Sequence, residues 1–218
     1  MGKKTKTSLK SWELRQKRGR RFKVLSLRKK YLIVTNGETE AAYFENYRGS
    51  TGPKIRIARR LKDPCLLVKK AVAERERRAK RGETFHETWI VMDRDKFVAN
   101  NGDEAQFQVA LKSAEENNIQ VAYSDDAFEL WYVLHYQDVN TPTTRKELVK
   151  LLEKHRVKRY EKGAKGDLYH EILHLRTEAI RRAHLLLKQA ESQAPTVNPC
   201  TRVHLLVEKL IENDPRLS

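Results

Sequence analysis

Four short hydrophobic segments along the first part of the chain predict buried β-strands. Each one is rich in β-branched or aromatic residues, or alternates apolar with polar positions, and ends at polar or turn-forming residues such as Asn36-Gly37. The segments are Tyr31–Thr35, Lys54–Ala58, Thr88–Met92 and Ile119–Tyr123.

Helical patterns fill the intervals between these segments. Thr39 is a candidate cap for a helix with Tyr43, Phe44 and Tyr47 on one face. Asp63-Pro64 and Asp103 are candidate starts of two further helices. Strands that alternate with helices predict an α/β fold, with a mostly parallel sheet and helices on both of its faces.

The pattern after Thr141-Pro142 is helical throughout. Apolar residues recur at helical spacing in three stretches, the second of which runs from Leu168 through Ile172, Leu175 and Ala179 to Leu186. We therefore divide the chain into a basic arm (1–30), an α/β core (31–140) and a helical C-terminal part packed on that core (141–218).

Composition excludes several classes of protein. The chain has 218 residues, of which 39% are hydrophobic and 34% charged, enough apolar side chains for a folded core. No segment approaches a membrane span and the first residues lack the apolar stretch of a secretory signal, so we expect a protein without membrane association. Cys65 and Cys200 lie far apart without neighbouring ligands, which indicates a reducing cytoplasm rather than a disulfide or zinc framework.

Positive charge is concentrated in the arm. Residues 1–30 hold thirteen Lys or Arg against one acid, a charge of +12 out of a total of +16. Such an arm is typical of proteins that neutralise nucleic-acid phosphates, although binding to anionic lipid, or solubility alone, is the alternative. The candidate contacts are Lys17, Arg18, Arg20, Arg21, Lys23, Arg28, Lys29 and Lys30, with Lys158 and Arg159 in a second basic segment that could equally be a solvated loop.

Polar residues follow three of the predicted strands. Because carboxyl ends of parallel strands form the usual binding edge of an α/β sheet, we expect these residues to form a site. Asp93 and Asp95, two positions apart after a buried strand, could chelate one Mg²⁺. The alternative is a surface turn in which Asp93 caps a loop and Arg94 pairs with an acid. The other two groups are Asn36, Glu38 and Glu40, and Asp125, Asp126 and Glu129.

Four blocks in this order resemble RloB-like proteins: Ile33–Phe44, Trp89–Asp95, Val121–Trp131 with Leu134-His135, and Asn198–Glu208. The resemblance extends from about Lys30 to the C-terminus. It implies a fold similar to Toprim, the catalytic module of topoisomerases, bacterial primases and overcoming-lysogenization-defect nucleases. It also implies a role in antiviral defence beside a partner ATPase.

The resemblance assigns roles to individual residues. Asp93 and Asp95 match the metal-binding pair, and Glu40 matches the acid that follows the turn glycine Gly37. Asn36 departs from the pattern, because it stands where a glutamate is expected. Glu129 is the further carboxylate that could complete the catalytic set, and Lys96 could steady a phosphate.

Two functions follow from this comparison. The first is a nuclease dependent on Mg²⁺ or Mn²⁺ that hydrolyses DNA or RNA, with Glu40, Asp93, Asp95 and Glu129 as its site. The second is a catalytically weakened module that binds nucleic acid or the ATPase partner, because the Asn36 amide cannot exchange a proton at neutral pH.

A competing motif occurs in the C-terminal part. His170–His174 reads His-Glu-x-x-His, the zinc-protease signature. On the predicted helix, both histidines point away from the apolar stripe and toward water, so we do not expect a protease.

Overall fold

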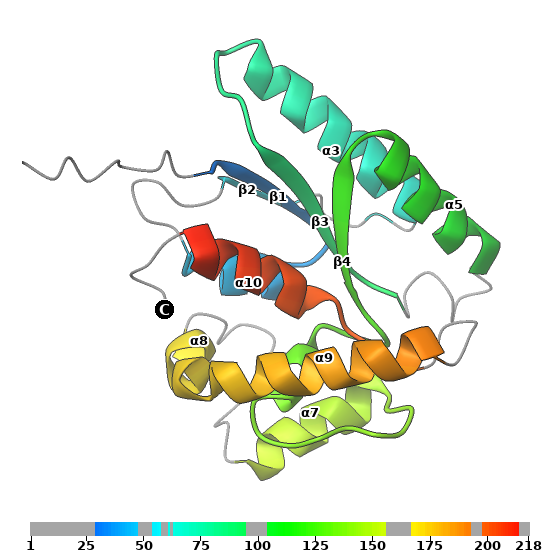
Figure 1. Ribbon diagram of the computed structural model, residues 1–218, viewed down its shortest axis with the longest axis vertical. Helices are drawn as coiled ribbons and strands as arrows, with labels where there is room; N and C mark the ends of the chain where they lie inside the picture. The colour runs from blue at the N-terminus through cyan, green and yellow to red at the C-terminus, as the bar shows by residue number, and fades with distance from the viewer. Residues whose placement is uncertain are drawn as a thin grey trace, which may run out of the picture.

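One parallel sheet organises the molecule, with its strands in the order β2-β1-β3-β4 (Figure 1). The computed structural model describes residues 29–47, 54–57, 61, 63–94, 104–155, 167–192 and 198–213. The elements in chain order are β1 (Tyr31–Thr35), α2 (Glu38–Glu45), β2 (Lys54–Ile57), α3 (Pro64–Ala79), β3 (Glu87–Asp93), α5 (Glu104–Glu116), β4 (Ile119–Ser124), α6 (Glu129–Val133), α7 (Arg145–Lys154), α8 (Asp167–Ile172), the 3-10 helix η1 (Leu173–Leu175), α9 (Arg176–Ser192) and α10 (Val203–Asn213).

The two faces of the sheet carry separate cores, because successive strand residues point to opposite faces. Leu32, Val34 and Met92 pack in the core that includes α3 and α5. Ile33 and Val91 belong to the larger core, which contains residues of α2, α6, α7, α9 and α10. The predicted α/β class with helices on both faces is therefore confirmed, and the C-terminal helices share the core of the sheet.

The beginning of α2 differs from the predicted one. Gly37, rather than Thr39, occupies the cap position, in an extended conformation and without a side chain to cap the helix. Thr35 donates its hydroxyl to the Gly37 carbonyl at 2.9 Å, which helps to hold the turn from β1 into α2. The predicted cap of α3 is confirmed, since the Asp63 carboxylate accepts from the Cys65 amide at 2.7 Å. Asp103 lies outside the described residues.

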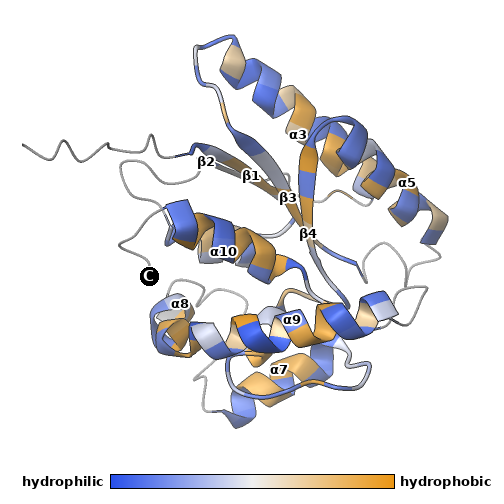
Figure 2. Cartoon of the chain, viewed as in Figure 1, coloured by the Kyte–Doolittle hydropathy of each residue, from blue (hydrophilic) through white to orange (hydrophobic). Residues whose placement is uncertain are grey.

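The single long helix predicted from Leu168 to Leu186 is wrong. A 3-10 turn, η1, separates α8 from α9, so the apolar positions of the two helices do not follow one continuous stripe. Figure 2 shows polar and apolar residues alternating along α9, as expected of a helix with one buried face.

The segment before α10 returns to the edge strand β4. Ser124 and Thr201 form an antiparallel bridge, and their hydroxyls lie 2.8 Å apart. The Asp125 amide donates to the Cys200 carbonyl at 2.8 Å. The end of β4 is thus held by a segment from near the end of the described chain, beside the residues that follow β3.

Candidate functional site

The ends of three strands bring the predicted site residues to one edge of the sheet. Thr35 of β1 pairs with Val91 of β3, and Asp93 pairs with Ser124 of β4. The amide of Asn36 continues the ladder by donating to the Val91 carbonyl at 3.2 Å. Residues that directly follow these strands therefore lie side by side.

Asp93 is the buried centre of this edge, with 2% of its surface exposed. Its Oδ1 accepts a hydrogen bond of 2.8 Å from the backbone amide of Phe128, immediately before α6. Its Oδ2 accepts from a guanidinium nitrogen of Arg145 at the start of α7. The carboxylate is consequently fixed from two elements that follow β4 in the chain.

Arg145 also connects Asp93 with Glu129. Its Nε lies 3.6 Å from Oε2 of Glu129, the first residue of α6. The backbone amide of Arg145 donates to the Asp126 carboxylate. One guanidinium therefore neutralises two of the predicted catalytic carboxylates, and a third carboxylate anchors the same residue through its backbone.

A second arginine lies beside this group. Arg94 Nη1 is 3.1 Å from the buried Asp125 carboxylate, and its Nη2 is 2.9 Å from Glu104 on α5. Burial raises the pKa of Asp125 to about 6, and the charge of Arg94 opposes that rise. Arg94 thus pairs with acids, as in the predicted alternative, but Asp93 is buried in β3 and not part of a surface turn.

Glu40 is positioned at the end of β1, on the first turns of α2. Its side chain is buried and folds back over the turn, so that a Cβ placed on Gly37 would lie 2.2 Å from Glu40 Oε2. Only glycine leaves room for this carboxylate. Asn36 is also buried, and its side-chain amide donates to the Leu61 carbonyl at 3.3 Å. Glu38 is exposed at the start of the helix.

Several predicted site residues belong to segments outside the described part of the chain. These are Asp95, Lys96, Lys158, Arg159, and the arm residues Lys17, Arg18, Arg20, Arg21, Lys23 and Arg28. Lys29 and Lys30 are described and exposed, just before β1. Lys29 Nζ is 3.4 Å from Glu87 at the start of β3. These two lysines therefore lie at the amino ends of the strands, whereas Asp93 lies at the carboxyl ends.

Sequence reasoning missed Arg145. It follows the capping residue Thr144 in a polar stretch, and nothing in its neighbourhood distinguishes it from other exposed arginines. Its role depends on how α7 packs against α6, a contact between elements that no local pattern encodes.

The donors at this edge fit a hard divalent cation. Asp93 and Glu129 offer carboxylate oxygens, the ligands that Mg²⁺ and Mn²⁺ prefer, and they already share a positive charge. Asp93 and Glu129 are therefore the described residues at this edge that could hold such an ion.

The zinc-protease motif does not form a site in the described structure. His170 and His174 are both exposed, as predicted, and the end of α8 at Ile172 separates them. The described groups that could hold a metal do not include either histidine.

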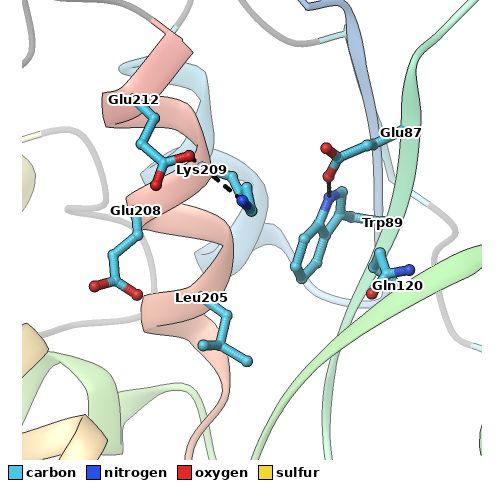
Figure 3. A pocket seen from close by; sticks show the side chains of 7 residues that line it. All are labelled: Glu87, Trp89, Gln120, Leu205, Glu208, Lys209 and Glu212. Atoms are coloured by element: carbon cyan, nitrogen blue, oxygen red, sulfur yellow. Dashed lines mark hydrogen bonds and ion pairs between the residues drawn. The ribbon is translucent and has the colours of Figure 1, made fainter.

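A groove of about 550 Å³ lies away from this edge, between α10 and the strands β3 and β4 (Figure 3). It is lined by Glu87, Trp89 and Gln120 from the sheet and by Leu205, Glu208, Lys209 and Glu212 from α10. The Trp89 indole donates to Glu87 at 3.0 Å. Since Glu87 begins β3 whereas Asp93 ends it, the groove belongs to the opposite end of the strand.

No helix in the described part of the chain has the length and apolar character needed to cross a membrane.

Comparison with known proteins identifies the family. No curated protein and no solved structure matches the chain. The family model described as RloB-like protein matches residues 31–210, which include both the sheet and the C-terminal helices. The chain belongs to the RloB-like protein family.

Proposed function

We propose that this chain is a Toprim-type phosphodiesterase that uses Mg²⁺ or Mn²⁺ to hydrolyse DNA or RNA in antiviral defence. Its proposed setting is the cytoplasm, with a partner ATPase that controls it. The observation that carries the proposal is the shared guanidinium of Arg145, which joins the buried Asp93 to Glu129 at the carboxyl edge of a parallel sheet.

The geometry favours a cation site over a structural ion pair. Burial of a carboxylate costs desolvation free energy. If Asp93 had only a structural role, an apolar residue of similar size would give the fold equal or greater stability. Here Asp93 at the end of β3 and Glu129 at the start of α6 lie on the same guanidinium, and Asp126 binds the backbone amide of Arg145. Asp93 and Glu129 would provide two oxygen ligands for a divalent ion.

The proposed division of labour follows from position. Asp93 and Glu129 would hold the metal together with Asp95, and Glu40 would orient a ligand or a water from the end of β1. When bound, the ion would supply charge to the phosphoryl oxygens and lower the pKa of a bound water. Arg145, displaced from the carboxylates, would be free to contact a phosphate, with which a guanidinium forms two parallel hydrogen bonds. The arm and Lys96 would add further phosphate contacts.

Metal-dependent cleavage tests this proposal. Purified protein is incubated with Mg²⁺ or Mn²⁺ and a panel of duplex DNA, single-stranded DNA and structured RNA. Asp93→Asn keeps an acceptor for the Phe128 amide but removes the charge, so we expect cleavage to be lost while the fold remains. Glu76→Gln, an exposed carboxamide substitution on α3, is the matched control and retains cleavage.

The second candidate is a binding module without catalysis. One observation favours it: Asn36 stands where the resemblance expects a glutamate, and its side-chain amide donates to the Leu61 carbonyl. This function predicts no cleavage on any substrate, with salt-sensitive binding that Asp93→Asn leaves intact. Repeating the panel with the partner ATPase separates it from an enzyme that the partner activates.

A further inference from the structure

Two C-terminal helices place three metal-ligating side chains together, far from the carboxylates described above. His184 comes from α9, whereas His204 and Glu208 come from α10 and lie four residues apart, on the same face of that helix. The ligand atoms of all three lie within 4.8 Å of one another. Figure 1 shows α9 and α10 next to each other, with α10 nearer the sheet, and the two helices are in contact.

The three side chains already contact each other. His184 Nε2 lies 2.9 Å from Oε1 of Glu208, and the rings of His184 and His204 are 4.4 Å apart at 73°. In Figure 3, Glu208 leaves α10 on the side away from Trp89, and thus not toward the centre of the groove. The cluster is therefore a feature of the contact between α9 and α10.

His204 is the unusual member of this cluster. It is completely buried, and neither ring nitrogen has a hydrogen-bond partner. The Thr201 carbonyl lies beside the ring without reaching hydrogen-bond geometry. A buried imidazole that makes no hydrogen bond loses its hydration without compensation. Coordination of a cation by one nitrogen would supply the missing partner.

The donor set selects the class of metal. Two imidazoles and one carboxylate are characteristic ligands of Zn²⁺, whereas Mg²⁺ prefers oxygen alone. With bonds of about 2.0–2.1 Å, tetrahedral ligand atoms lie about 3.4 Å apart, so small side-chain rotations would bring the three atoms into place.

We infer that His184, His204 and Glu208 form a binding site for one Zn²⁺ ion, with a fourth position open to water. His184 and Glu208 are each partly exposed, which provides a path of entry for the ion. A bound ion would join α9 to α10 and so stabilise the helices that hold the end of β4 beside Asp93. The inference does not depend on the proposed nuclease, because it uses none of the nuclease residues.

Zinc binding by the full chain without a histidine tag tests the inference. Zinc content is measured after dialysis, affinity by competition with a chromophoric chelator, and coordination by the visible spectrum after Co²⁺ substitution. We expect one ion per chain with a tetrahedral Co²⁺ spectrum. His184→Ala and Glu208→Gln each weaken binding at least about tenfold, since each removes one ligand of three.

Three matched variants exclude other sources of zinc binding. His170→Ala with His174→Ala removes the exposed histidine pair, and Asp93→Asn alters the carboxylate site; both retain the ion if the inference is correct. Glu212→Gln, one turn further along α10, also retains it. Zinc also raises the melting temperature of the native chain but not that of His184→Ala. Absence of stoichiometric zinc, or equal affinity in native protein and His184→Ala, would overturn the inference.

Discussion

The guanidinium of Arg145 binds the carboxylate of Asp93 across a sequence separation of 52 residues. Asp93 ends β3 and Arg145 begins α7, so this contact joins the sheet to the C-terminal helices at the candidate site. Glu129 lies on the same guanidinium, so one arginine neutralises an acid from the sheet and an acid from α6.

Removal of Arg145 is expected to destabilise the protein. Arg145→Met takes a counter-charge from a buried carboxylate, which costs about 3 kcal/mol in unfolding free energy by analogy with other buried pairs. Urea denaturation measures the loss. If the acids bind a cation, Mg²⁺ restores part of the stability in Arg145→Met and raises it less in the native protein, because the ion replaces the missing charge.

Asp93→Asn in the Arg145→Met background provides the control. The double variant removes the Asp93 charge together with its partner and leaves only the charge of Glu129 without the guanidinium, so we expect it to be more stable than Arg145→Met alone and to respond less to Mg²⁺. A double variant that is less stable than Arg145→Met would contradict the account of the pair.

The turn between β1 and α2 predicts a specific effect of Gly37→Ala. The new Cβ would overlap the buried Glu40 carboxylate, which must then leave its place. Because the overlap is with the end of a flexible side chain, we expect only a small loss of stability but a fall in any cleavage activity to the level of Glu40→Gln. Gly82→Ala is the control: Gly82 has a φ of 77° and nothing near its Cβ position, so the substitution strains the backbone but leaves cleavage unchanged.

Stability is expected to fall on acidification because of His135. Its ring is buried, with Nδ1 at 2.9 Å from the Trp131 carbonyl, and burial lowers its pKa from 6.5 to about 4. The unfolded chain takes up a proton below pH 6.5, whereas the folded chain does so only near pH 4. The stabilisation is therefore complete above pH 6.5 and is lost as the pH falls from 6.5 to 4. His204 acts in the same direction.

Asp125 acts in the opposite direction. Its folded pKa of about 6 exceeds the ordinary 3.8, so its protonation between pH 6 and 3.8 stabilises the fold. A comparison of the native protein with His135→Phe cancels this contribution. We expect the stability advantage of the native protein over the variant to decrease by about 2–3 kcal/mol between pH 7.5 and 4.5. An advantage that does not change with pH, together with an ordinary pKa for His135 by NMR, would refute the assignment.

The basic arm is expected to dominate the salt dependence of nucleic-acid binding. Residues 1–28 contain eleven Lys or Arg and one acid. Their deletion should reduce the slope of log affinity against log salt by about 0.9 for each duplex-DNA phosphate that the arm neutralises. Lys29 and Lys30 stay in the shortened chain, because their backbone amides bind Asn213 and His86. Lys188→Gln, an exposed substitution on α9, controls for nonspecific loss of charge, and an unchanged slope after the deletion would exclude the arm.

Much of the α/β core could be predicted from periodicity. The strands β1, β3 and β4 were each predicted to within one or two residues, because their apolar runs are bounded by polar turns. Asp63 was correctly predicted as a cap, since the Asp-Pro pair is a local signal. The cap at Thr39 was wrong because Gly37 supplies the cap through its backbone, and such a cap leaves no side-chain signature.

The candidate site could be predicted from the sequence only in part. Asp93, Glu40 and Glu129 follow strand ends, where topology concentrates functional groups, and the structure places all three there. Arg145 and the cluster of His184, His204 and Glu208 carry no such signal, because they arise where separate helices meet.

The sequence by itself determined three features: the succession of strands and helices along the chain, the concentration of charge in the arm, and the family of the chain. Each depends on short segments whose residues lie close together in the chain. Tertiary structure alone decided which carboxylate meets which arginine, and which histidines share a helix contact. Those pairings arise from the packing of α6, α7, α9 and α10 around the sheet. Packing depends on the shapes of many side chains at once, and so no local pattern of the chain encodes it.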